Sequence, residues 1–177
     1  MRLIFRPARG IDPPPCAGYD VGNSRFQWGS VPSFAFRGGP VLTLDAKGRI
    51  TVPSRYRDVL MSTVNGQMVI AKNPARCLTL YPKPVWDAFE SDLARLPMRD
   101  EGWRRLYIGS ATDVEIDSGS RVLIPPELRS WAALDREVKL LGMGSSFEIW
   151  DPQRYEVREA TAIALGAPEA LKSLVIR

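Results

Sequence analysis

The stretch "LDAKGRITVP", residues Leu44–Pro53, recurs in altered form as "IDSGSRVLIP", residues Ile116–Pro125. In both copies an arginine stands four residues after an aspartate, and a proline stands four residues after that arginine. A short segment with a glycine separates the aspartate from the arginine, and β-branched residues follow, which is typical of two strands joined by a tight turn. We therefore expect the chain to contain the same strand–turn–strand unit twice.

The surroundings of the two copies also repeat, as a strand, a turn, a strand, a helix, two strands and a second helix. Asp45 and Asp117 stand 72 residues apart, and the aromatic residues Tyr81 and Trp150, which close the two units, stand 69 residues apart. This is one internal duplication and not a solenoid, which needs at least three copies. The expected segments are strand 35–45, turn 46–48, strand 49–53, helix 54–61, strands 67–72 and 77–82, helix 83–96 and short helix 101–109, followed by strand 111–117, turn 118–120, strand 121–125, helix 126–134, strands 137–143 and 145–151, and helix 152–165.

The composition argues against catalysis. The 177 residues include no histidine, which removes the commonest general base and the commonest metal ligand. The two cysteines, Cys16 and Cys77, are too few for a structural zinc site and are interpreted as unpaired thiols of a reducing compartment. The sequence contains no phosphate-cradling glycine loop and no nucleophile–base pair. We therefore expect no enzyme activity, no metal, no cofactor and no small-molecule substrate.

Residues 1–33 differ from the rest of the chain. They are rich in proline and glycine and show no sustained apolar periodicity, so they are interpreted as a flexible N-terminal extension. A misplaced translation start is the alternative interpretation. No apolar run approaches the ~20 residues of a membrane helix, and none matches the core of a signal peptide. The sequence thus predicts a cytoplasmic protein without membrane contact.

The two copies of the repeated stretch lie in opposite electrostatic surroundings. Residues 37–57 carry five basic residues and one acidic residue, a net charge of +4, whereas residues 111–136 carry three basic and five acidic residues, a net charge of −2. A basic patch attracts phosphates and an acidic patch repels them. This difference predicts that the first copy binds nucleic acid more strongly than the second.

Each turn has a structural interpretation and a functional one. Asp45 and Asp117 are expected to hold their turns closed by accepting backbone hydrogen bonds. We also expect a glycine at positive φ in each turn, Gly48 in the first copy and Gly119, which stands one place earlier, in the second. Arg49 and Arg121 begin the returning strands, close enough to pair with these aspartates.

Turn formation does not explain a lysine at the tip of the first turn. Lys47 would place its charge where a DNA groove could meet it, and the planar guanidinium of Arg49 suits both phosphate and guanine edges. For Arg49, stapling and DNA binding both stay open. The candidate DNA-binding residues are Lys47, Arg49, Arg37 and Arg121.

The segments "LDAKGRITVPSRYRDVL" and "IDSGSRVLIPPELRSWAAL" resemble the two D-x-x-x-R repeats of the MraZ family, bacterial transcriptional regulators of the SpoVT/AbrB-like group. The resemblance extends from about Phe36 to Tyr155 and includes "CLTLYPKPVWDAFESDLARLP", "RRLYIGSATDVEID" and "LDREVKLLGMGSSFEIWDPQRYE". It implies an α+β fold in which two swapped hairpins form one pseudo-two-fold β-barrel with peripheral helices. The second copy departs from the family pattern because it lacks the lysine and its glycine is displaced.

The resemblance further implies a sequence-specific, nucleoid-associated regulator that assembles into a ring-like homo-oligomer. Its partner would be double-stranded promoter DNA with repeated boxes, and it would repress the division and cell-wall gene cluster that contains its own gene. The D-x-x-x-R residues of the family correspond to Asp45 and Arg49 and to Asp117 and Arg121. The alternatives are an AbrB-like antitoxin, usually a shorter chain with a single repeat, and a structural nucleoid scaffold.

The expected organisation has five parts. They are the N-terminal extension 1–33, the first SpoVT–AbrB repeat with its following helix 36–86, a helical connector 87–110, the second repeat 111–155, and a C-terminal helix and tail 156–177.

Overall fold

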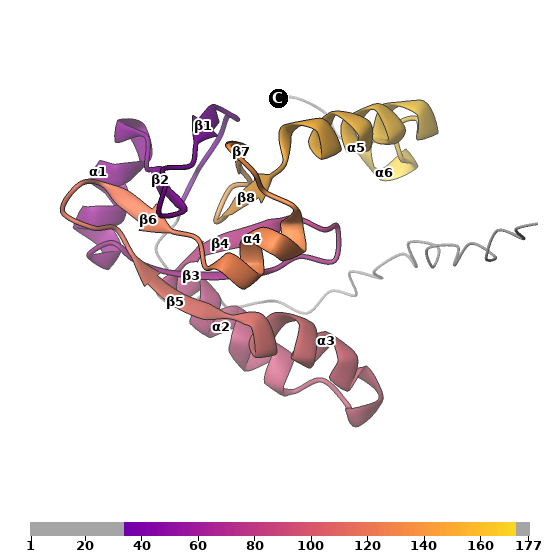
Figure 1. Cartoon of the computed structure of the whole chain (residues 1–177). Coiled ribbons are helices and arrows are strands. Elements are labelled where there is room, and N and C mark those ends of the chain that lie inside the picture. Colours follow the sequence, from indigo (N-terminus) through magenta and orange to yellow (C-terminus); the bar gives the residue numbers. More distant parts are fainter. Residues whose placement is uncertain (1–33, 173–177) are drawn as a thin grey trace, which may run out of the picture. The chain divides into compact units, whose positions relative to one another are not determined.

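The computed structural model describes residues 34–172. The expected N-terminal extension and the last five residues of the expected tail lie outside the described residues. The elements in chain order are β1 (Val41–Thr43), β2 (Arg49–Thr51), α1 (Ser54–Val64), β3 (Gln67–Lys72), β4 (Leu78–Pro82), α2 (Lys83–Ala94), the 3₁₀ turn η1 (Met98–Asp100), α3 (Glu101–Tyr107), the 3₁₀ turn η2 (Ile108–Ser110), β5 (Thr112–Glu115), β6 (Arg121–Leu123), α4 (Pro126–Ala132), β7 (Glu137–Gly142), β8 (Phe147–Trp150), α5 (Pro152–Leu165) and α6 (Glu169–Lys172) (Figure 1).

The described strands form one open sheet and one separate ribbon. The sheet has six antiparallel strands in the order β1-β7-β8-β4-β3-β5, and the ribbon consists of β2 paired with β6. Among the described residues no pairing joins the edge strands β1 and β5. The expected α+β class is confirmed, but the expected closed barrel is wrong, since the sheet stays open and the returning strands pair in a ribbon of their own.

Each strand that flanks a repeated turn pairs with the other repeat. β1 lies beside β7 with Val41 opposite Lys139, and β5 lies beside β3 with Asp113 opposite Val69. In the ribbon, Ile50 of β2 faces Val122 of β6, 72 positions further along the chain. These registers are equivalent when the two repeats are exchanged, so the repeats are related by an approximate two-fold symmetry.

The first strand is shorter than expected. The sequence predicted a strand over residues 35–45, but β1 covers three residues, and Phe36 contributes only an isolated bridge to Gly144. Gly38 has a φ of 90°, and Pro40 has no N–H to donate to a ladder. The segment between Phe36 and β1 therefore leaves the regular strand geometry.

The core packs the ribbon and α1 against one face of the sheet. Ile50 and Val122 are fully buried, because the two ribbon strands place these residues on the core side. The ring of Tyr56 on α1 packs edge-to-face against Phe36 and Phe147, and its hydroxyl donates to the Arg37 carbonyl at 2.5 Å. The ribbon that carries the turns is thus anchored by its own buried residues.

A second, smaller cluster packs α2 and α3 against β3. Trp86 of α2 packs with Val69 and Ala71 of β3, and Tyr81, Phe89, Tyr107 and Ala111 pack against this cluster. Burial raises the pKa of the Tyr81 hydroxyl to about 12. α3 follows as the short helix that the sequence predicted.

No helix in the described part of the chain combines the length and the apolar character that a membrane crossing needs.

Candidate nucleic-acid interface

The first repeated turn is closed by the carboxylate of Asp45. One oxygen, Oδ1, accepts from the backbone N–H of Lys47 at 2.9 Å and of Arg49 at 3.0 Å. Two backbone bonds complete the turn, from Gly48 N to Asp45 O at 2.8 Å and from Asp45 N to Arg49 O at 2.9 Å. Gly48 has a φ of 79°, a conformation that glycine adopts without steric cost.

The second turn has the same architecture with a different residue at its tip. Asp117 Oδ1 accepts from the backbone N–H of Gly119 at 2.8 Å and of Arg121 at 2.9 Å. The expectation that Gly119 takes positive φ is wrong, because Ser120 does so, with a φ of 62°. Ser120 stands 72 positions after Gly48, so the displaced glycine does not alter the turn, and a serine takes the left-handed position.

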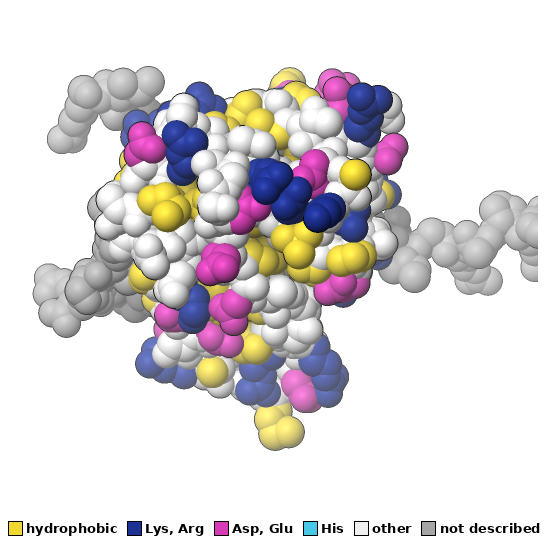
Figure 2. Space-filling model, turned by 60° about the vertical axis from the view of Figure 1, so that its left-hand side comes forward, with side chains coloured by type: hydrophobic (Ala, Val, Ile, Leu, Met, Phe, Trp, Pro, Cys, Tyr) yellow, Lys and Arg dark blue, Asp and Glu magenta, His cyan; other side chains and the backbone are white. Residues whose placement is uncertain are grey.

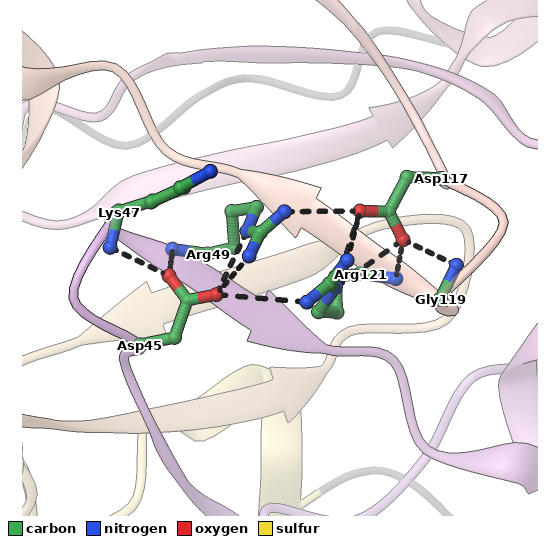
Figure 3. A network of polar contacts seen from close by, with 6 residues as sticks. All are labelled: Asp45, Lys47, Arg49, Asp117, Gly119 and Arg121. Carbon is green, nitrogen blue, oxygen red and sulfur yellow. Dashed lines mark hydrogen bonds and ion pairs between the residues drawn. The ribbon is translucent and has the colours of Figure 1, made fainter.

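The two aspartates and two arginines form one network across the repeats (Figure 3). Arg49 Nη2 lies 2.6 Å from Asp45 Oδ2 and Arg49 Nη1 lies 3.5 Å from Asp117 Oδ2. Arg121 Nη2 lies 3.1 Å from Asp117 Oδ2 and Arg121 Nη1 lies 3.9 Å from Asp45 Oδ2. The side chains are 22–35% exposed, so solvent or a ligand can reach them.

Both carboxylates are stabilised in their ionised form. The side-chain hydrogen bond from Arg49 lowers the pKa of Asp45 to about 2, and the backbone hydrogen bond from Arg121 lowers the pKa of Asp117. At neutral pH two negative and two positive charges therefore balance within the network. A net positive charge at this surface has to come from residues outside these four.

The turn tips are tied to the opposite repeats by the backbone. Val52 N donates to the carbonyl of Ser120, and Ile124 N donates to the carbonyl of Gly48, both at 2.9 Å. Each tip therefore has a fixed position relative to the strand that continues from the other turn. The two turns form a single surface.

Two arginines of this surface were missed by the sequence reasoning as candidate sites. Arg57 Nη1 donates to Ser120 Oγ at 3.1 Å, and Arg129 lies so close to Gly48 that a Cβ built there would be 2.6 Å from its Cζ. Both arginines stand four residues after a repeated proline, a spacing that could have identified them. Arg129 belongs to the acidic stretch 111–136 in the sequence, but in the structure it lies against the first, basic turn. The net charge of each segment therefore did not indicate it.

The other sequence candidates occupy different places. In Figure 3 the ammonium end of Lys47 lies apart from the Asp45 carboxylate, and within residues 34–172 it forms no ion pair. Arg37 is not brought to the network. It precedes Gly38, whose carbonyl bonds Gly142 N at the far end of β1, whereas Leu44 N at the turn end bonds Arg136 O.

The acidic character around the second turn is present on the surface. Val41 and Thr43 are the exposed residues of β1, and the corresponding exposed residues of β5 are Asp113 and Glu115. Figure 2 shows basic and acidic side chains side by side on one face of the molecule, with hydrophobic side chains between them. The face seen in Figure 2 is therefore not uniformly basic.

The fold and the site define an α+β protein of two repeats. Strands of one repeat pair with strands of the other, and the two repeats contribute to one ionic network. The family model described as "MraZ protein, putative antitoxin-like" matches residues 35–106 and again residues 107–175. Proteins named "Transcriptional regulator MraZ" from Burkholderia mallei (strain SAVP1), Burkholderia thailandensis and Burkholderia cenocepacia are each 51% identical over 138 residues, which is 78% of this chain and 97% of each relative. The chain belongs to the MraZ family.

Proposed function

We propose that this chain is a DNA-binding transcriptional regulator that contacts duplex promoter DNA with the surface of its two turns. The main support for this proposal is the surface that the two turns share, in which four ion-paired side chains are flanked by Lys47, Arg57 and Arg129. The relatives named as transcriptional regulators support the regulatory role. Cations beside a rigid turn can neutralise phosphates, and guanidinium groups can also recognise guanine.

The residues have distinct roles in this proposal. Arg49 and Arg121 are oriented by the aspartates, which reduces the side-chain entropy that each arginine loses on binding a base or a phosphate. Lys47 contacts the phosphate backbone, because its ammonium group acts as a point charge. Asp45 and Asp117 position the arginines and do not contact DNA, since carboxylates repel phosphate.

The proposed target is the set of repeated boxes upstream of the division and cell-wall gene cluster that contains this protein's own gene, with repression as the outcome. A ring-like homo-oligomer would present one turn surface per subunit to successive boxes. We also infer that each repeat contributes a swapped hairpin, which the cross-repeat strand registers support.

One second candidate has a specific observation in its favour. The description of the matching family includes the word "antitoxin-like", so a small toxin is an alternative partner. Co-purification of a stoichiometric small protein with the full chain would favour that role. A structural scaffold would bind DNA without preference for the boxes.

The test is a footprint of the full chain on the DNA upstream of its own gene, combined with binding titrations at several salt concentrations. Protection of repeated boxes, with an affinity that falls steeply as salt rises, is the expected result. Protection without sequence preference would favour the scaffold. No binding at low salt would overturn the proposal.

A further inference from the structure

The two helix arginines at the turn tips are equivalent in position but not in their contacts. Arg57 lies on α1, four residues after Pro53. Arg129 lies on α4, four residues after Pro125. Each lies on the turn of the other repeat. Their neighbours differ at two points, the turn residue at positive φ, which is Ser120 or Gly48, and the residue that follows the arginine.

Arg57 is held by polar groups at both ends of its guanidinium. Its Nη1 donates to Ser120 Oγ at 3.1 Å, and its Nε lies 3.5 Å from the Asp58 carboxylate. A DNA phosphate that approached Arg57 would have to displace the serine hydroxyl and would also meet the negative charge of Asp58. Both effects weaken a phosphate contact at this side.

Arg129 lacks both of these groups. The turn residue that faces Arg129 is Gly48, which has no side chain. The residue after Arg129 is Ser130, whose hydroxyl donates to the Pro126 carbonyl. Arg129 Nε donates to the Ile124 carbonyl at 3.1 Å, which fixes the side chain over the tip. Among residues 34–172 no carboxylate pairs with Arg129 and no group accepts from its terminal nitrogens.

We propose that Ser120 and Asp58 retain Arg57 on the protein, while Arg129 is left to bind a DNA phosphate, so that the turn surface has a polarity. This inference rests on the proposed DNA binding and specifies which side of the surface neutralises the backbone. Lys47, Gly48 and Arg129 form the phosphate-binding side. Ser120 and Arg57 form a side on which the basic residue is already occupied.

The polarity can be measured with the full chain and a duplex that contains the protected boxes. Each phosphate contact contributes about 0.9 to the slope of log affinity against log salt concentration. Arg129→Ala should reduce that slope by about this amount, whereas Arg57→Ala should leave it nearly unchanged. Equal reductions in the two variants would overturn the proposal.

A gain-of-contact variant provides the sharper test. Ser120→Gly together with Asp58→Ser removes from Arg57 the two groups that Arg129 lacks, and the slope should steepen by about 0.9. Adding Arg57→Ala to this pair should cancel the gain. If the gain persisted without Arg57, it would come from the lost Asp58 charge alone, and the retention of Arg57 would be refuted.

Two controls separate folding from binding. Ser118→Gly changes an exposed residue of the same turn and should leave the slope unchanged. Ser120→Gly should not lower the melting temperature, because glycine adopts the φ of 62° without strain. Failure of the unmodified protein to bind the duplex would refute the proposed function, whereas normal binding with an unchanged slope in the gain-of-contact variant would refute only the polarity.

Discussion

Arg49 of the first repeat reaches Asp117 of the second, with 3.5 Å between Nη1 and Oδ2, while it also pairs with Asp45 of its own turn. The reverse contact, from Arg121 to Asp45, completes the network at 3.9 Å. Each aspartate therefore faces two arginines. The two D-x-x-x-R motifs are not independent staples, and substitutions in one are expected to depend on the other.

The coupling can be measured by a double-mutant cycle on stability. Arg49→Ala or Arg121→Ala alone leaves each aspartate with one arginine, so each should reduce the free energy of unfolding by only about 0.5–1 kcal/mol, as for partly exposed pairs. The double variant leaves both carboxylates unpaired and should cost more than the sum of the single changes. Chemical denaturation measures all three variants. Additivity within about 0.3 kcal/mol would contradict the coupling.

Lys47 and Arg49 should differ in how they affect binding. Lys47→Ala should weaken binding to all sequences and reduce the salt slope by about 0.9, because it removes one phosphate contact. Arg49→Ala should weaken binding to the boxes by about 1–3 kcal/mol and reduce discrimination, because a base contact is lost. Titrations against box DNA and a scrambled duplex separate the two effects. Equal losses on both duplexes for Arg49→Ala would exclude base reading by this residue.

Gly48→Ala should affect both stability and binding. The φ of 79° disfavours alanine by about 1–2 kcal/mol, and the new methyl group would lie 2.6 Å from Arg129 and displace it. Gly119→Ala is the matched control, because its methyl group would approach the Arg121 guanidinium at 2.8 Å but Gly119 does not have positive φ. Melting temperature and box affinity should both fall for Gly48→Ala, and the stability loss should be smaller for Gly119→Ala. Equal stability losses would show that side-chain displacement, not backbone strain, dominates.

Most of the element order could be predicted from the sequence, because the duplication supplied each unit twice. The expected helix at 54–61 is α1, and the expected strand at 67–72 is β3. What could not be predicted was pairing between repeats, since periodicity identifies the buried face of a strand but not its partner. The ribbon of β2 and β6, and the open sheet that replaces the expected barrel, follow from that long-range pairing.

Only the part of the candidate site that is local in sequence could be predicted. Asp45, Lys47 and Arg49 are close in sequence, so local reasoning placed them together. Arg129 comes to the first turn only because α4 follows a strand that pairs across the repeats. Ser120 at positive φ was missed because glycine is the expected residue there, and a serine carries no such signal.

Stability should fall at acidic pH through the aspartates of the network. The folded state lowers the pKa of Asp45 to about 2 and also lowers that of Asp117, so their contribution is complete above the unfolded pKa of about 3.9 and is lost as pH falls toward 2. Asp45→Asn keeps an oxygen for the backbone hydrogen bonds but cannot ionise. The difference in free energy of unfolding between the native chain and this variant should shrink as pH falls from about 5 to about 2. A constant difference would show that the Asp45 charge does not stabilise the fold.

Affinity should depend on the number of boxes and not only on their sequence. A surface in which two aspartates offset two arginines leaves only a few cations for phosphate, so one box should bind weakly at physiological salt. Subunits linked in one oligomer raise the effective concentration of each surface at the next box, so several boxes should bind much more tightly than one. Inserting about 5 bp between boxes turns them to opposite faces of the duplex and should remove much of this gain, whereas inserting about 10 bp restores the facing. Titrations of duplexes with one box, several boxes and each insertion measure the effect. The same affinity for one box and for several would mean that a single turn surface suffices, and the role of the oligomer in DNA binding would have to be abandoned.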